Sequence, residues 1–184
     1  MNNWVILFVR TGSEEKLAGV LGEKLNAGEY QPFLPVKETP SRSKGVIRKE
    51  RRLLFPGYVF IQMEIETGSI AEKLESDLTN TTGKWHEDIY SILHYGNDKN
   101  DVAIRQKERQ YWERLFDSDF CVSSSVGVIE GDIIRITSGP LVGMESRIKK
   151  INRHKREAVV EMEVMGSVRE VRVMLEVVEK TKRT

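Results

Sequence analysis

Residues 53–63 read LLFPGYVFIQM, an apolar block interrupted by a proline and a glycine. Pro56-Gly57 predicts a turn, because proline presets φ and glycine tolerates positive φ. Residues 58–63 are rich in β-branched and aromatic side chains, which predicts an inner strand. Apolar residues beside a turn often stay at the surface. Phe55 and Tyr58 therefore belong either to plain core or to an exposed aromatic pocket.

Upstream of this block, the chain begins as a compact α/β unit. Residues 4–9 are an unbroken apolar run, which predicts a strand covered on both faces. Ser13 is a good N-cap for a helix whose leucines and valine recur at helical spacing until Gly28. A second strand is expected near residues 30–36.

Residues 40–52 break this pattern with a loop-like segment followed by dense charge. Proline, serine and glycine at 40–45 predict a protruding loop or hairpin. The basic side chains that follow favour either a solvated loop or an approach to upstream DNA or a polymerase.

Downstream of the apolar block, a short helix is expected near residues 70–78, followed by a polar turn at 79–83. A strand is expected near residues 91–95. Residues 104–115 carry an apolar stripe at helical spacing and predict another helix.

Beyond residue 117 the periodicity changes. Residues 118–126 contain Ser123-Ser124-Ser125 and no periodic pattern, which predicts a linker. From residue 127 onward apolar and polar residues alternate in short stretches separated by glycine and asparagine turns. Residues 127–184 therefore predict a small all-β barrel, and residues 1–117 a separate α/β domain.

Composition narrows the class of protein. The 184 residues carry a net charge of only +1, so bulk charge favours no particular partner. A single cysteine, Cys121, excludes an intrachain disulfide and suits a reducing cytosol. The start of the chain lacks the pattern of a signal peptide and is too short an apolar run to span a membrane. We therefore expect a soluble cytoplasmic protein.

No feature of the sequence predicts catalysis. The three histidines, His86, His94 and His154, lack metal-ligand spacing, and Cys121 has no neighbour that would lower its pKa. The glycines of residues 139–143 do not lead into a helix, so they do not form a phosphate-binding loop. We expect no catalytic residues, no metal and no cofactor.

Four features in this order resemble the NusG family over nearly the whole chain. They are the opening strand with Trp4, the block Phe55-Pro56-Gly57-Tyr58 after a basic loop, the helix led by Ile104, and residues 130–143. The last of these looks like a KOW motif, in which a strand enters a tight turn. The resemblance implies an N-terminal domain that is an RNP-like α/β sandwich and a C-terminal KOW domain that is an SH3-like barrel.

The same resemblance implies a partner. It places Trp4, Phe55, Pro56, Gly57 and Tyr58 around a pocket that grips the clamp helices of bacterial RNA polymerase. Some Gram-positive family members also place an Asn-Thr pair against non-template DNA, and Asn80-Thr81 is the matching pair here. The alternative for that pair is an ordinary polar turn.

Two departures point to a specialised member of the family. The chain has Val164-Met165-Gly166-Ser167 where the family has an aromatic-Gly-Arg turn that contacts ribosomal protein S10, so that contact is in doubt. Residues 147–156 hold six basic residues, one histidine and no acid. This run resembles the LoaP group of antiterminators, whose KOW domain binds a leader RNA hairpin.

The run therefore predicts a site for structured RNA, since lysine and arginine supply phosphate contacts and arginine also reads bases. The predicted RNA-binding residues are Arg147, Lys149, Lys150, Arg153, His154, Lys155 and Arg156. The alternative is an idle, solvated loop. For the whole protein we expect an antitermination factor; a general NusG-type elongation and pausing factor and a ribosome-associated KOW protein are the alternatives.

Overall fold

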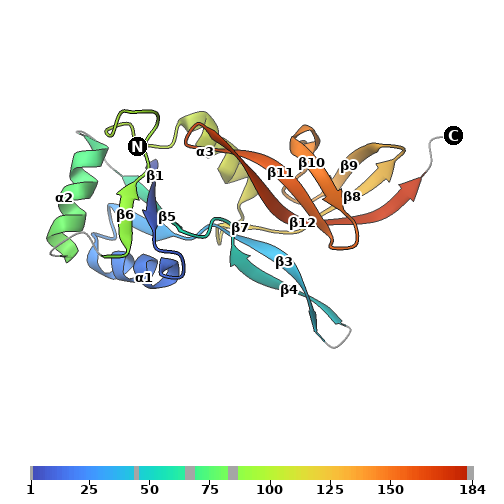
Figure 1. Ribbon diagram of the computed structural model, residues 1–184, viewed down its shortest axis with the longest axis horizontal. Helices are drawn as coiled ribbons and strands as arrows, with labels where there is room; N and C mark the ends of the chain where they lie inside the picture. The colour runs from blue at the N-terminus through green and yellow to red at the C-terminus, as the bar shows by residue number, and fades with distance from the viewer. Residues whose placement is uncertain (1, 44–45, 65–68, 83–86, 182–184) are drawn as a thin grey trace. The chain divides into compact units, whose positions relative to one another are not determined.

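The computed structural model describes residues 2–43, 46–64, 69–82 and 87–181 (Figure 1). The chain forms two compact units. The first combines Met1–Pro35 with Phe55–Arg109, and the second combines Val36–Leu54 with Gln110–Thr184. None of the helices in the described ranges is long and apolar enough to cross a membrane.

The first unit is built on a four-stranded sheet with the order β2-β5-β1-β6. Its strands are β1 (Asn2–Val9), β2 (Tyr30–Phe33), β5 (Tyr58–Glu64) and β6 (Ile89–Ile92), and each adjacent pair is antiparallel. The predicted inner strand at residues 58–63 is thus confirmed as β5, between β2 and β1. The strand expected near 91–95 begins earlier and ends at Ile92.

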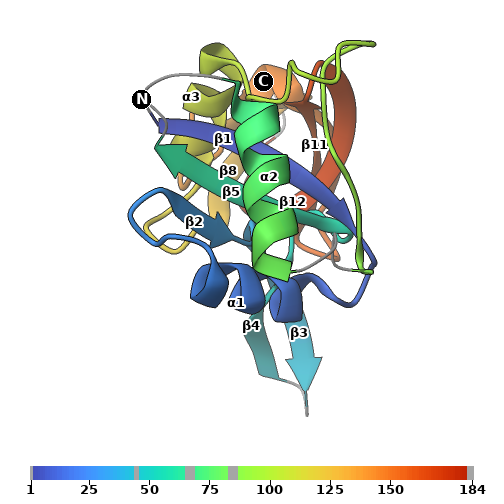
Figure 2. The same ribbon diagram turned by 90° about the vertical axis from the view of Figure 1, so that its left-hand side faces the viewer.

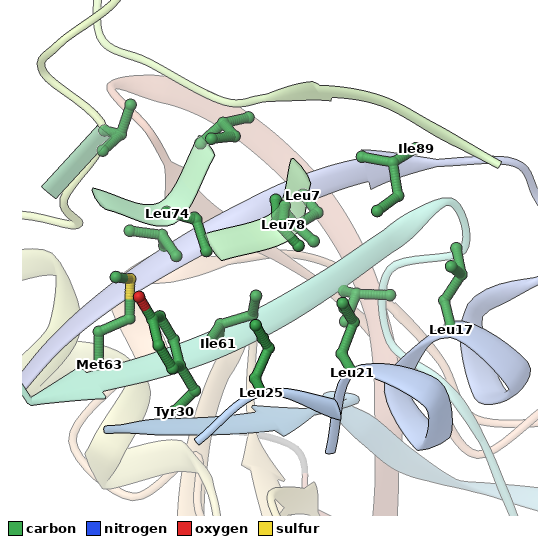
Figure 3. Packing of buried hydrophobic residues seen from close by; sticks show 14 of the residues in the cluster. Leu7, Leu17, Leu21, Leu25, Tyr30, Ile61, Met63, Leu74, Leu78 and Ile89 are labelled. Carbon is green, nitrogen blue, oxygen red and sulfur yellow. The ribbon is translucent and has the colours of Figure 1, made fainter. Parts of the chain in front are cut away.

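Helices α1 (Glu14–Lys24) and α2 (Ile70–Thr82) cover one face of this sheet (Figure 2). Leu17 and Leu21 of α1 and Leu74 and Leu78 of α2 pack over β1 and β5 (Figure 3). On the strands, alternate residues supply the core because successive side chains point to opposite faces. These core residues are Val5, Leu7, Val9, Val59, Ile61 and Met63.

Helix α2 runs further than the sequence indicates. The predicted helix ends near residue 78, whereas α2 continues to Thr82. Asn80 and Thr81 therefore lie on the last turn of a helix, not in the expected polar turn. Asn80 is exposed, and its amide lies 3.4 Å from the Ser76 hydroxyl one turn earlier.

In the second unit, residues 36–53 form a hairpin. Strands β3 (Val36–Ser43) and β4 (Val46–Leu53) pair antiparallel, which confirms the hairpin alternative for the basic segment. Strand β7 (Cys121–Val122) pairs parallel with β3. Helix α3 (Gln106–Leu115) begins in the first unit and ends in the second.

The remaining strands form a five-stranded sheet with the order β10-β11-β12-β8-β9, here called the C-terminal sheet. Its strands are β8 (Ser125–Glu130), β9 (Ile133–Ser138), β10 (Ile148–Asn152), β11 (Glu157–Val164) and β12 (Ser167–Thr181). The short 3-10 helix η1 (Glu145–Arg147) precedes β10. The alternating pattern of residues 127–184 is thus confirmed as strands.

The segment predicted as a linker, residues 118–126, has more order than its composition indicates. Cys121 and Val122 are buried in β7, and Ser125 begins β8 with no exposed surface. The Ser125 hydroxyl accepts the backbone N–H of Leu141 at 3.1 Å. Part of the predicted linker therefore anchors the turn after β9.

Gly139 explains the tightness of that turn. Its φ is +94°, and a Cβ built there would lie 2.6 Å from Ser125 Cα and 2.7 Å from Ser124 O. Positive φ strains other residues, and no side chain fits at that distance from backbone. The glycine of the predicted KOW turn is required by close packing on residues 124–125.

Candidate functional site

An aromatic surface forms on the face of the first unit's sheet opposite α1 and α2. Phe8 of β1 pairs with Tyr58 of β5, so both rings point to the same face. The Phe8 ring centroid lies 5.5 Å from that of Tyr58 and 5.2 Å from that of Tyr90. Phe8 is 39% exposed and Tyr90 54% exposed. We call Phe8, Phe55, Tyr58 and Tyr90 the aromatic surface.

Trp4 lies on the same face but does not belong to this surface. Its side chain is only 2% exposed, and its ring packs edge-on against Phe33 at a centroid distance of 5.0 Å. The expectation that Trp4 forms part of an exposed patch is therefore wrong. Because it sits four residues before Phe8 on the same strand face, Trp4 supports the surface from the core.

The turn that carries Phe55, Pro56 and Gly57 is held by a buried carboxylate. Glu14, the first residue of α1, is 2% exposed; its two oxygens accept the backbone N–H groups of Gly12 and Gly57, each at 2.6 Å. Gly57 adopts φ +86°, as the predicted turn requires. Phe55 stacks on the buried Phe60 ring at 6.0 Å. This turn therefore presents Phe55 and Tyr58 from a fixed backbone.

The second candidate site is the basic segment, residues 147–156. The pairing of β10 with β11 shifts register between Ile148 and Lys150. Such a bulge leaves one residue extra, so Lys149 and Lys150 are both exposed while Ile148 and Ile151 are partly buried.

Not all cations of this segment are free of partners. Lys149 pairs with Glu161 at 2.9 Å, and Arg156 pairs with Glu176 at 3.2 Å. Arg147 lies 5.0 Å from the centre of the Tyr111 ring, a cation–π contact. The segment contains no acid in sequence, but neighbouring strands supply two carboxylates. The absence of acids from the segment itself therefore does not leave all six charges unneutralised.

Of the remaining cations, Lys150 lies exposed in β10, and the others lie at the turn between β10 and β11. Arg153, His154 and Lys155 are exposed there, and the Asn152 side-chain oxygen accepts the Lys155 backbone N–H at 2.9 Å. Arg156 closes the turn with φ 52°. A groove beside the turn is lined by Ile151, Asn152, Arg153, His154, Arg156, Glu176 and Val177. The turn thus presents cations around a concave, polar site.

Two observations bear on catalysis in the described residues. Cys121 is buried, and desolvation raises the pKa of its thiol, which makes it a poor nucleophile. Within the described ranges, no three His, Cys, Asp or Glu side chains gather where they could hold a metal ion. His86 lies outside the described residues. The two candidate sites have the features of binding surfaces.

Comparison with known proteins identifies the family. The family model described as transcription termination factor nusG matches residues 2–111, more than half of the chain. The chain belongs to the NusG family. Proteins of this family are transcription factors, and the matched residues contain the α/β unit described above together with the β3–β4 hairpin.

Individual NusG relatives match along nearly the whole length. The transcription termination/antitermination protein NusG of Pasteurella multocida is 26% identical, with 97% of this chain and 94% of that protein covered. The NusG of Thermus thermophilus is 25% identical, with coverage of 89% and 90%. A solved structure that concerns domain interaction in Thermotoga maritima NusG matches with a TM-score of 0.55 at 22% identity, covering 96% of this chain and 94% of that one. This structural likeness shows a shared fold.

Sequence reasoning within this NusG-type domain missed Phe8 and Tyr90. The apolar run at residues 4–9 predicts a strand buried on both faces, which hides the exposed position of Phe8. Alternation from Trp4 through Ile6 to Phe8 is the signal that places all three on one face. Tyr90 carried no comparable signal, because it reaches Phe8 only through the pairing of β6 with β1.

Proposed function

We propose that the chain is an operon-specific transcription antitermination factor that travels on bacterial RNA polymerase in the cytoplasm. One unit docks on the polymerase through the aromatic surface, and the other binds a nascent RNA hairpin through the basic segment. Holding both ends on one complex makes RNA capture effectively intramolecular, so modest RNA affinity suffices.

One observation carries polymerase docking: the rings of Phe8, Tyr58 and Tyr90 are contiguous, with Phe8 and Tyr90 exposed and Tyr58 partly buried. Single exposed apolar residues are ordinary, but soluble proteins seldom expose aromatic rings that contact one another unless a partner covers them. Aromatic side chains supported from below are the usual anchors of protein interfaces. The partner that the family resemblance implies is the pair of clamp helices of the polymerase.

The exposed turn at Arg153, His154 and Lys155 supports RNA binding. Its cations crowd a concave site whose one acid, Glu176, is already paired with Arg156. Phosphates supply the affinity of such a site, and arginine supplies base contacts where a hairpin or bulge opens the groove. The arrangement of exposed cations around a groove favours an RNA-binding site over a solvated loop without a function.

We propose further that the C-terminal sheet is a KOW domain of the LoaP type. The turn between β11 and β12 supports this assignment, since Met165 is only 8% exposed and no aromatic side chain stands there. A contact with ribosomal protein S10 through an exposed apolar pair therefore lacks its usual residues. Asn80 and Thr81, at the end of α2, remain the candidates for contact with non-template DNA.

Transcription in vitro tests this function. The template carries the leader of the operon in which the gene lies, followed by its terminator, and purified bacterial RNA polymerase transcribes it with and without the full chain. We expect readthrough to rise, and to rise much less when the leader hairpin is scrambled. Arg153→Ala should abolish the leader dependence, whereas Lys16→Ala, on exposed α1, should not.

The outcome separates the alternatives. Equal readthrough on intact and scrambled leaders would favour a general NusG-type elongation factor. Absence of any effect on the polymerase, with RNA binding retained, would favour a ribosome-associated RNA-binding protein.

A further inference from the structure

The pairing of the C-terminal sheet extends the basic segment into residues far away in sequence. Lys150 of β10 pairs with Val159 of β11, which pairs with Arg172 of β12. Side chains of paired residues point to the same face of a sheet. With strands about 4.8 Å apart, Lys150 and Arg172 stand about 10 Å apart on one face. Figure 1 shows β10, β11 and β12 as adjacent strands.

The β3–β4 hairpin continues this line of cations. The Lys37 ammonium donates to the Arg172 backbone carbonyl at 2.6 Å, which places β3 against β12. Lys37 in turn pairs with Arg52 of β4. We call Lys150, Arg172, Lys37 and Arg52 the cation row; it crosses β10, β12, β3 and β4.

The row carries an excess of positive charge. In the part of the chain that the structure describes, no carboxylate forms an ion pair with Lys150, Arg172 or Lys37. Arg52 forms an exposed pair with Glu50 at 3.3 Å, which contributes little.

Lys37 lies beside both arginines of the row. Burial, with the nearby charges of Arg172 and Arg52, lowers the pKa of its ammonium, and Glu157 opposes this shift. Three acids lie on the same face beside the row: Glu157, and Glu161 with Glu170, which pair two residues further along β11 and β12. Of these, Glu161 is already paired with Lys149. An anion bound beside Lys37 would relieve the repulsion among the three cations.

We propose that the cation row binds the sugar-phosphate backbone of a single-stranded RNA segment that adjoins the hairpin. This deepens the proposed function and rests on it, because Lys150 belongs both to the basic segment and to the row. The row runs from the C-terminal sheet onto the β3–β4 hairpin, joined by the Lys37–Arg172 hydrogen bond. A single line of cations suits one strand of phosphates. Contacts of this kind hold RNA in register without reading its sequence.

The test compares two RNAs and two double variants of the full chain. The RNAs are the leader hairpin alone and the same hairpin with a single-stranded tail of about ten uridines. Lys37→Gln/Arg172→Gln removes two cations of the row. Lys16→Gln/Lys107→Gln removes the same charge from exposed positions of the first unit. Thermal melting first establishes that both double variants fold.

We expect the tail to strengthen binding by the wild-type chain and by the Lys16/Lys107 variant. The Lys37/Arg172 variant should lose this gain, and the slope of log affinity against log salt should fall by about 1.4, at about 0.7 per phosphate on a single strand. Lys150→Gln, which breaks no hydrogen bond of the hairpin, should lower the slope by about 0.7. Arg172→Lys, which keeps the positive charge at that position, should retain most of the affinity that the tail adds.

Two results would contradict RNA binding by the cation row. The first is a tail that adds nothing to wild-type affinity, and the second is an equal loss of the tail's added affinity in both double variants. Failure of the proposed function has a different signature. In that case the wild-type chain would bind the tailless hairpin no better than a scrambled single strand, whatever the tail does.

Discussion

The aromatic surface and the turn at residues 152–156 are both exposed, but they relate to the fold in opposite ways. Phe8 and Tyr58 continue a sheet face whose other members, Trp4 and Phe60, are core residues, and Phe55 of the adjoining turn stacks on Phe60. Arg153, His154 and Lys155 sit on a turn, and their side chains are exposed. Changes at the aromatic surface should therefore affect both binding and stability, whereas changes at the turn should affect binding alone.

The largest expected effect comes from destabilising the C-terminal sheet, which carries the turn at residues 152–156, while the aromatic surface stays intact. Gly139→Ala adds a Cβ 2.6 Å from Ser125 Cα at φ +94°. Strain and overpacking together should lower the free energy of unfolding of the C-terminal sheet by about 3 kcal/mol or more. RNA binding should be lost while polymerase binding persists, as measured by denaturant titration and by co-sedimentation with polymerase.

Gly22→Ala is the matched control, because nothing lies within 4 Å of its built Cβ on α1. Alanine in a helix interior should raise stability by about 0.5–1 kcal/mol. Simultaneous loss of polymerase binding in the Gly139 variant would contradict the separation of the two sites.

The next effect concerns the aromatic surface itself. Tyr58→Ala should weaken polymerase binding by about 1–3 kcal/mol, in the range of interface anchors. It should also lower stability, though by less than truncation of a fully buried ring. Tyr58→Phe keeps the ring and should bind as the wild type does. Titration of labelled polymerase measures the affinity; unchanged binding by Tyr58→Ala would remove the surface from the docking site.

The sequence predicts the parts of these two sites that depend on local segments, and misses the parts that depend on strand pairing. The turn at residues 152–156 is local, so its cations could be named from the sequence. Their neutralisation could not, because Glu161 and Glu176 reach Lys149 and Arg156 only through pairing of β10, β11 and β12. The Pro56-Gly57 turn is likewise local, so Phe55 and Tyr58 could be named from the sequence. Contact of Phe8 with Tyr58 and Tyr90 depends on the pairing of β1 with β5 and β6, and burial of Trp4 depends on packing against Phe33, so neither could be.

A smaller effect distinguishes two kinds of cation on the turn. Arg153→Ala should weaken binding of the leader hairpin by about 1–3 kcal/mol and leave other RNAs nearly unaffected, if its guanidinium reads a base. Lys155→Ala should weaken binding of all RNAs about equally and lower the salt slope by nearly one. Neither change should alter the melting temperature, because both side chains are exposed. Calorimetric titration at several salt concentrations measures both quantities.

Identical behaviour of the two variants on every RNA would show that the turn contacts phosphates only. Lys149→Ala is the control for charge, since its ammonium is already paired with Glu161. We expect it to change the slope less than Lys155→Ala does.

The smallest effect concerns residues 118–126, which the sequence predicts to be a flexible linker between domains of residues 1–117 and 127–184. In the structure, the Glu38 carboxylate accepts the Ser124 backbone N–H at 2.7 Å and pairs with Lys49 at 2.9 Å. Desolvation raises the pKa of Glu38, but the hydrogen bonds from Lys49 and Ser124 outweigh it and leave the pKa below its usual value. A depressed carboxylate pKa means that the contact contributes stability above the unfolded pKa and loses it as pH falls through the folded one.

Glu38→Gln should therefore speed proteolysis at residues 123–125 modestly near neutral pH, and the difference from wild type should shrink in acid. Cleavage that is fast in both chains at every pH would instead restore the flexible linker, with two folded fragments as its products.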